Sequence, residues 1–212
     1  MNKLGYVLGT LVSLSSFTAF AAPTTWDIDP AHSSAAFSVR HMMVSTVRGN
    51  FGKLTGTVTI DGTDWKTAVG DASVDANTVD TREAKRDGHL KSPDFFDVGQ
   101  YPELTFRSTK IEPKGKDRFS VSGDLTIRGT TNPVSFDAVI EGVAADSDGG
   151  QHLGASGTLV IERGQWGLVW NQPLANGVLV GDKVTVQLEL SAIDETIARK
   201  WGLAPAAVAS AA

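Results

Sequence analysis

The residues best suited to chemistry gather in one stretch, 81–97, where charged, histidine and aromatic side chains follow one another closely. Asp80, Glu83 and Asp87 are spaced three and four residues apart, so on a helix they would share one face. Paired carboxylates with a nearby histidine, here His89, are the groups that general acid–base catalysis uses. A helix N-terminus and a solvated helix face require the same spacing, so both interpretations stay open from these residues alone.

Other catalytic and metal-binding motifs are missing from the sequence. There is no G-x-S-x-G pattern, because Ser156-Gly157 lies inside a strand-like segment rather than at a turn. No glycine-rich phosphate loop is present, and the chain contains no cysteine. The histidines do not share H-x-H or H-E-x-x-H spacing: they are His32, His41, His89 and His152. The sequence therefore predicts no metal site and no catalytic cofactor.

A short helix is predicted over about 81–90, within the same stretch. Asp80 would be its N-cap, and Glu83 would reach back to that residue from three positions later. The helix would end at Ser92, because the residue before Pro93 avoids the α region. This helix would interrupt a chain that otherwise has the pattern of strands.

The remaining segments alternate between apolar and polar residues, most clearly over Leu54–Ile60, where threonine occupies the odd positions. Seven or eight such segments, separated by turn signals such as Asp61-Gly62, predict an antiparallel barrel or sandwich. Met42–Gly49 does not fit this pattern clearly and is predicted to be a loop or a crossing. The inward rows include glycines that suit sharply bent barrel strands: Gly56, Gly123 and Gly157.

The inward rows are otherwise almost purely apolar: Leu54, Val58, Ile60, Val74, Leu104, Phe106, Leu125, Ile127, Phe136 and Ile140. Alternation alone favours plain core packing, because the pattern does not separate a filled interior from a hollow one.

The first 21 residues have the pattern of a secretory signal peptide. Lys3 supplies a positive charge, an apolar run follows, and Ala19-Phe20-Ala21 provides an A-x-A cleavage site. A membrane anchor fits less well, because the run is short and interrupted by hydroxyl side chains. We therefore expect residues 1–21 to be removed and the mature protein to lie in the periplasm or to be secreted.

The mature chain is expected to contain one domain, 22–192, followed by a short helical or disordered tail, 193–212. Removal of Lys3 leaves 18 basic residues against 24 acidic ones, a net charge of −6. An acidic domain without a Lys/Arg cluster is a poor binder of nucleic acid. No later segment approaches the length of a membrane span, so no stable membrane insertion is expected.

Five segments of the mature chain carry a recognisable combination of motifs: WDIDPAHS at 26–33, FSVRHMMVSTVRG at 37–49, RDGHLKSPDFFDV at 86–98 with Tyr101-Pro102, GDLTIRGTTNPV at 123–134, and VGDKV at 180–184. Together they resemble the YceI-like family of periplasmic, lipocalin-like proteins. The resemblance implies an all-β, antiparallel up-and-down barrel with a short helix in one connection. It also implies a long polyisoprenoid, such as an isoprenoid quinone tail, as interior ligand, and it makes a homodimer plausible.

On this resemblance we expect apolar side chains to line a ligand cavity: Phe37, Val39, Leu54, Val58, Val74, Phe95, Phe96, Leu104, Phe106, Leu125, Ile127, Phe136, Ile140, Trp166 and Leu168. His41, Arg48 and His89 are expected at its mouth, where they would meet a head group. Trp166 stands where the family usually has a phenylalanine before Gly167, so it is expected to shorten or reshape the cavity. For Arg86 and Asp87 a role in fixing the helix is favoured.

Three hypotheses follow from the sequence. The first is a carrier of an isoprenoid lipid; the second is an enzyme acting on such a lipid through His89 and Asp87; the third is a filled barrel with a structural, interaction or stress-response role. The carrier hypothesis is energetically sound. Burial of ~20 carbons at ~0.8 kcal/mol each gives a gross ~16 kcal/mol, whereas micromolar binding needs only about 8 kcal/mol.

Overall fold

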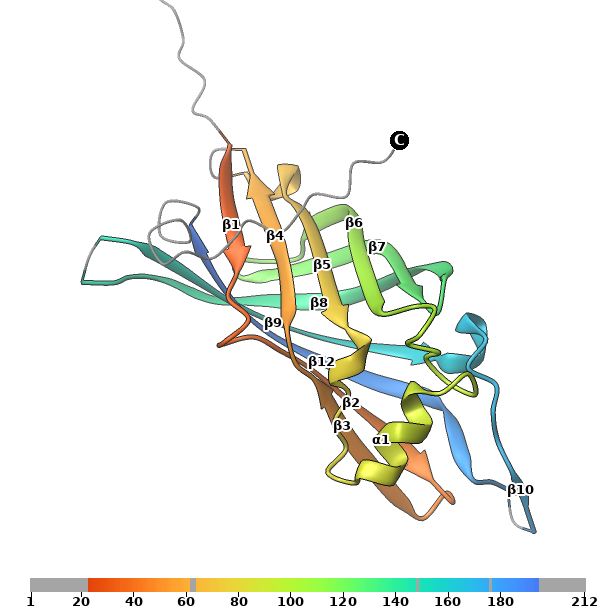
Figure 1. The fold of residues 1–212 in the computed structure, drawn as a ribbon. Coiled ribbons are helices and arrows are strands. Elements are labelled where there is room, and N and C mark those ends of the chain that lie inside the picture. Colours follow the sequence, from red (N-terminus) through yellow and green to blue (C-terminus); the bar gives the residue numbers. More distant parts are fainter. Residues whose placement is uncertain (1–22, 62–63, 148, 176, 195–212) are drawn as a thin grey trace, which may run out of the picture.

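The fold is taken from a computed structural model that describes residues 23–61, 64–147, 149–175 and 177–194 (Figure 1). The predicted signal peptide therefore lies outside the described residues. Within them the strands are β1 Thr24–Ile28, β2 Ser34–His41, β3 Ser45–Phe51, β4 Leu54–Ile60, β5 Val69–Asp75, β6 Glu103–Pro113, β7 Arg118–Ile127, β8 Thr130–Ala145, β9 Gln151–Glu162, β10 Pro173–Leu174, β11 Gly177–Val178 and β12 Val180–Asp194. The helices are α1 Ala84–Lys91 and the 3-10 turns η1 Trp65–Thr67, η2 Ala76–Thr78 and η3 Arg163–Trp166.

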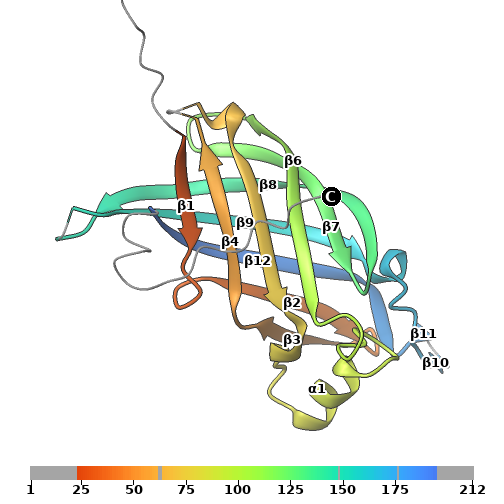
Figure 2. The same cartoon turned by 45° about the horizontal axis from the view of Figure 1, so that its top comes forward.

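Eight antiparallel strands close into a ring in the order β1, β4, β5, β6, β7, β8, β9, β12, and β12 pairs back with β1. β4, β5 and β6 form one wall, and β8, β9 and β12 form the opposite wall (Figure 2). Each strand pairs with its neighbours along the chain once β1 and β2 are taken as two halves of one bent strand, and β3 and β4 as another. The predicted all-β, antiparallel up-and-down barrel with one short helix is therefore confirmed.

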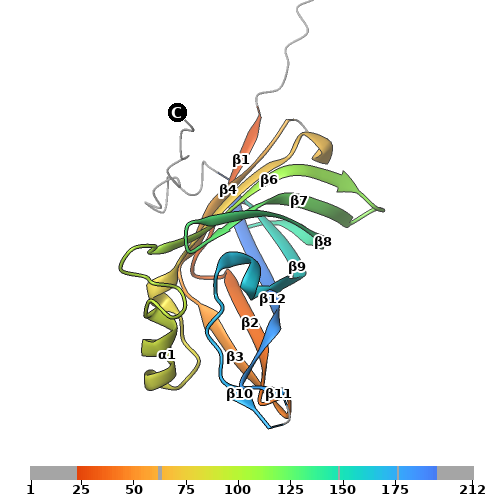
Figure 3. The ribbon, with the colours of Figure 1, turned by 90° about the vertical axis from the view of Figure 1, so that its right-hand side faces the viewer.

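Beyond the ring, β2 and β3 continue as a two-stranded ribbon, and β2 pairs with the first part of β12, Val180–Glu189 (Figure 3). The prediction of a loop or crossing over Met42–Gly49 is wrong for most of that segment. β3 begins at Ser45, and only Met42–Val44 form a turn. Alternation is weak here because neither face of the ribbon is fully buried, so its burial pattern resembles that of a loop.

Helix α1 lies in the connection from β5 to β6, as predicted, but it begins three residues later than expected. Glu83, rather than Asp80, is the N-cap: its carboxylate accepts hydrogen bonds from the backbone N–H groups of Lys85 and Arg86 at 3.1 and 2.7 Å. Asp80 instead accepts from the N–H of Arg82 at 2.7 Å in a separate tight turn. A glutamate at the cap satisfies two free donors and places its charge at the positive helix end.

The last strand extends the domain beyond its predicted boundary. Ile193 and Asp194 were expected in a tail, yet they pair with Asp27 and Trp26 of β1. Ile193 is fully buried, because this pairing closes the ring. The remainder of the predicted tail, 195–212, lies outside the described residues.

Gly123 allows β6 and β7 to approach closely on the inner face of the barrel. A Cβ atom placed there would lie 2.4 Å from the Phe106 ring and 2.4 Å from the carbonyl oxygen of Arg107. The aromatic ring of Phe106 could move aside, but the carbonyl oxygen of Arg107 could move only if strand β6 shifted. This position requires glycine for lack of space, whereas the sequence had suggested sharp bending of the strand as the reason.

We therefore expect Gly123→Ala to lower the free energy of unfolding by about 1–3 kcal/mol, the usual cost of overpacking. Gly154→Ala in β9 is the matched control, because its nearest new contact would be at 3.5 Å. That control should be neutral or slightly stabilising. Urea unfolding measures both, and equal losses in the two variants would contradict the packing argument.

Candidate ligand cavity

The barrel encloses a cavity of about 230 Å³. Side chains from all eight ring strands and from the start of the ribbon line it, so the interior is not filled by the protein's own side chains. Ten residues predicted to line a cavity do so: Phe37, Leu54, Val58, Val74, Leu104, Phe106, Leu125, Ile127, Phe136 and Ile140. That they bind a ligand stays a prediction.

Few polar side chains border this cavity, and three of them form hydrogen bonds or ion pairs with other protein groups. Ser108 accepts a hydrogen bond from the N–H of Gly70 at 2.8 Å, and Ser156 donates to Glu141 on the outside of the barrel. The carboxylate of Asp71 lies 3.7 Å from the guanidinium of Arg107. The cavity therefore offers an apolar surface, suited to hydrocarbon rather than to a polar substrate.

Large side chains gather at two places around the cavity. On one side the rings of Trp65 and Phe119 meet with centroids 5.4 Å apart. On the other, the end cluster packs together beneath α1 and η3: it consists of Leu90, Phe95, Phe96, Trp166, Leu168 and Trp170. Trp65 was missed by sequence reasoning because it follows a turn signal and belongs to no alternating segment.

Four residues of the predicted lining belong to this end cluster instead. Phe95, Phe96, Trp166 and Leu168 do not line the cavity, because they form the layer that covers its end. Trp166 is almost fully buried, and its indole N–H donates to the carbonyl of Leu125 at 3.0 Å. Trp166 thus belongs to the layer over the end of the cavity, and its effect on the length or shape of the cavity stays a prediction.

Val39 does not line the cavity either, because it lies on the ribbon beyond the ring, paired with Val47 and Val184. The three polar residues expected at the cavity mouth do not line it either. His41 is the last residue of β2 and pairs with Ser45, while Arg48 is exposed on β3. They follow the ribbon away from the cavity.

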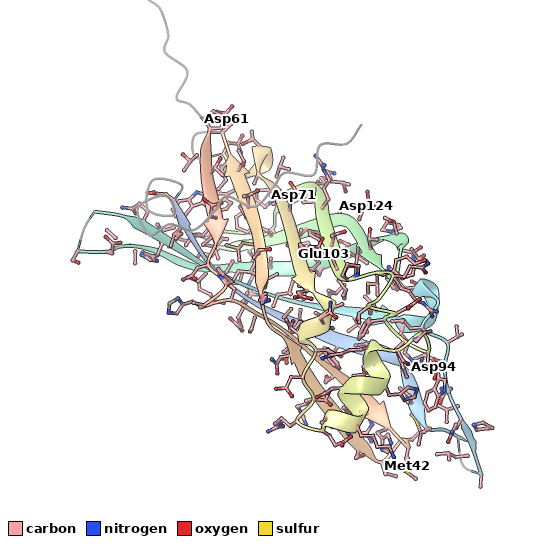
Figure 4. The ribbon with its side chains drawn as sticks, viewed as in Figure 1. Met42, Asp61, Asp71, Asp94, Glu103 and Asp124 are labelled. Atoms are coloured by element: carbon pink, nitrogen blue, oxygen red, sulfur yellow. The ribbon has the colours of Figure 1, made fainter. Side chains whose placement is uncertain are left out.

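His89 packs against the end cluster rather than facing the cavity. Its ring meets those of Phe95 and Trp170 edge-on, with centroids 5.0 and 4.6 Å apart. Its Nε2 lies 2.9 Å from the carboxylate of Asp94 (Figure 4). The histidine therefore holds the helix against the barrel end, and the closed cluster separates it from the cavity.

Arg86 and Asp87 form a structural network around the buried Thr81, which is the interpretation that the sequence favoured. Asp87 accepts from the N–H of Thr81 at 2.9 Å and from its hydroxyl. Arg86 donates to the same hydroxyl at 2.8 Å and to the Thr81 carbonyl at 2.9 Å. Both side chains thus tie α1 to the segment that precedes it.

Arg163 is a buried cation that sequence reasoning missed. Only 4% of it is exposed, and its guanidinium donates to the carbonyl oxygens of Leu168, Trp170 and Gly181. Burial lowers the pKa of Arg163, and Asp182, 3.4 Å away, partly opposes that shift. Arg163 fixes the segment that carries the two tryptophans of the end cluster, Trp166 and Trp170. No residue spacing could reveal it, because the bonds just named go to backbone carbonyls.

Within the described ranges, no three His, Asp or Glu side chains stand close enough to hold a metal ion. None of the helices there has the length and apolarity of a membrane span.

The fold and the cavity define a closed antiparallel barrel with an apolar interior. Residues 26–192 match the YceI-like domain, and the chain belongs to that family. It is 34% identical to a UPF0312 protein of Vibrio parahaemolyticus over 163 residues, 76% of this chain and 86% of that protein. A UPF0312 protein of Staphylococcus aureus is 37% identical over 163 residues, with 76% and 92% covered.

Solved structures of other proteins have the same fold. The YCEI protein of Campylobacter jejuni superposes with a TM-score of 0.64 at 28% identity, covering 74% of this chain and 90% of that one. A polyisoprenoid binding domain from Saccharophagus degradans, implicated in plant cell wall breakdown, superposes with a TM-score of 0.63. Its identity is 15%, with 80% and 98% covered, so this likeness concerns the fold.

Arg163→Leu should lower the free energy of unfolding by about 3–5 kcal/mol, because it leaves buried carbonyl oxygens without donors. Arg118→Leu is the control, since Arg118 is exposed and its replacement should change stability by less than about 0.5 kcal/mol. Denaturant unfolding with tryptophan fluorescence measures both. A small loss for Arg163→Leu would mean that the end cluster is held without it.

Truncation of Phe95 and of Phe106 to alanine should lower the free energy of unfolding by different amounts, because the ring of Phe106 borders the cavity. Phe95 is buried in the end cluster, so Phe95→Ala should cost about 3–5 kcal/mol. Phe106 faces the cavity, so Phe106→Ala enlarges a space that already exists and should cost about 1–2 kcal/mol less than Phe95→Ala. Thermal and urea unfolding test this, and an equal or larger loss for Phe106→Ala would place that ring in close packing.

Proposed function

We propose that this protein binds and carries a long isoprenoid lipid, such as an isoprenoid quinone or a polyprenyl chain, with its tail in the barrel cavity. The observation that carries the proposal is the cavity itself, which is apolar and lined from all eight ring strands. A structural neighbour is a polyisoprenoid binding domain, which supports the same ligand class. The predicted signal peptide would place this carrier in the periplasm.

The size of the cavity limits how much of the lipid it holds as it stands. A cavity of ~150 Å³ stays dry and accommodates benzene. In proportion, about 230 Å³ accommodates roughly nine or ten carbons, or about two isoprene units. Burying ~10 carbons contributes a gross ~8 kcal/mol, which is already in the micromolar range before ordering costs. The rest of a longer tail would lie outside this volume.

The enzyme hypothesis loses the two residues on which it relied. His89 is engaged by Asp94 and by the end cluster, and Asp87 is engaged by Thr81, so both are accounted for by structural contacts. Neither residue lines the cavity. A carrier needs no catalytic group, because burial of hydrocarbon supplies the binding energy.

The function predicts that a side chain filling the cavity displaces the lipid. Ala155 of β9 lines the cavity, so Ala155→Phe should remove most of the co-purified polyprenyl species while the barrel still folds. Organic extraction of the purified protein followed by mass spectrometry measures the amount. Circular dichroism and thermal unfolding establish that the variant is folded.

Val160→Phe is the matched control, because Val160 lies on the same strand and is 59% exposed on the outside. It adds the same ring without entering the cavity, so lipid occupancy should equal that of the natural protein. Absence of any polyprenyl species from the natural protein, purified from a host that exports it, would reject the carrier function. Equal occupancy in Ala155→Phe would place the ligand elsewhere.

A further inference from the structure

The far end of the β2–β3 ribbon exposes three consecutive apolar residues. Met42 is 45% exposed, Met43 48% and Val44 79%. Figure 4 shows Met42 at this end, away from the closed ring. We call Met42–Val44 the ribbon tip. Single exposed apolar side chains are ordinary, whereas a contiguous group at the end of a projecting element indicates a surface that meets something.

The backbone of the ribbon tip is unfavourable for methionine. Met42 and Met43 have φ values of 51° and 61°, and the N–H of Val44 donates to the carbonyl of His41 at 3.1 Å. Two positive φ values at the centre of such a turn are typical of type I′, which prefers Asn-Gly. The backbone of the turn therefore gives no reason for two methionines at this position. We look for the reason in their exposed side chains.

The ribbon tip is held in place rather than loose. The guanidinium of Arg40 donates to the Met43 carbonyl at 2.8 Å and to the Thr46 hydroxyl at 3.1 Å. The N–H of Met42 donates to the carbonyl of Leu179 at 2.8 Å, which ties the tip to the neighbouring segment. The apolar side chains are thus presented by a fixed backbone, and little ordering is needed on contact.

The charge around the ribbon tip is positive in an otherwise acidic chain. Residues 30–60 contain Arg40, Arg48 and Lys53 but no aspartate or glutamate, although the whole chain has a net charge of −5. Arg40 pairs with Thr46, and Arg48 pairs with Ser38, so both cations lie on the same face of the ribbon. The adjacent segment 164–181 carries no charged residue, and Asp182, which follows it, lies 3.4 Å from the guanidinium of Arg163.

We propose that the ribbon tip docks on the surface of a bilayer containing anionic phospholipids, with the methionines and Val44 at the acyl boundary and the two arginines among the phosphates. Apolar side chains beside Lys or Arg are the combination that binds such surfaces without spanning them. The contact agrees with the expectation of no stable insertion, because a three-residue tip reaches only the interface. The inference goes beyond the proposed function, since docking needs no ligand in the cavity.

The test is flotation of the mature protein with vesicles of phosphatidylcholine mixed with phosphatidylglycerol, and with vesicles of phosphatidylcholine alone. The natural protein should float with the anionic vesicles, less at high salt, and not with the neutral ones. Met42→Asn combined with Met43→Gly should reduce binding at least tenfold. The same double variant should raise Tm by a few degrees, because it relieves two unfavourable φ values. A structural role for the methionines would give the opposite change in Tm.

The contribution of charge is tested with Arg48→Gln. This variant should bind the anionic vesicles about fivefold more weakly, which is the usual contribution of one cation near an anionic surface. Its control is Arg118→Gln, which makes the same charge change in β7, outside the ribbon. Val143→Ser is the apolar control, because Val143 is 53% exposed on β8. Both controls should float like the natural protein.

Three results would overturn the proposal. The natural protein could fail to float with anionic vesicles, or the Met42→Asn/Met43→Gly variant could float as well as the natural protein. Alternatively, ultracentrifugation could reveal a dimer that the Met42→Asn/Met43→Gly variant abolishes while vesicles bind neither protein, which would assign the tip to a second copy of the chain. Ala155→Phe should dock normally, so loss of lipid cargo and loss of docking are distinguishable.

Discussion

Closure of the sheet is the constraint on which the rest of this structure depends. The pairing of Trp26, Asp27 and Ile28 with the end of β12 satisfies the backbone of both strands and leaves the ring without an edge. Closure also fixes the circumference, because the number of strands determines how wide the interior is. At eight strands the inward side chains nearly meet, so the space left at the centre depends on where the largest ones are placed.

Several of the largest side chains are held over one end of the barrel, outside the cavity. Trp166, Phe95 and Trp170 are held over one end by the backbone bonds of Arg163 and by α1, while Trp65 and Phe119 meet elsewhere on the wall. Small residues such as Ala72, Ala138 and Ala155 border the cavity between them. Burial of the Arg163 guanidinium has a desolvation cost. Its hydrogen bonds hold the end cluster over the cavity, and Arg163 itself does not line the cavity.

Period-two alternation predicted which face of each strand points inward, but it carries no information on position along the barrel axis. Leu54 and Val39 have the same pattern, yet one lines the cavity and the other lies on the ribbon. Likewise, Trp166 and Phe95 are apolar and inward, but they cover the end. The helix was predicted from local signals, whereas its true cap, Glu83, depended on the turn that Arg82 makes just before it. Arg163 gave no signal, because its role depends on backbone atoms that only the fold brings together.

The ring and the ribbon are structurally continuous, because the same two chain segments, β1–β2 and β3–β4, contribute strands to both. β1 and β2 form one bent strand and β3 and β4 another, so the residues that precede the ribbon tip also line the cavity. Phe37 and Phe51 face each other with ring centroids 5.4 Å apart, and Phe51 meets Phe96 of the end cluster at 5.5 Å. Packed aromatic contacts therefore run without interruption from the base of the ribbon to the cover of the cavity. Phe51 therefore lies where the ribbon, the wall and the cover meet, since it also lines the cavity.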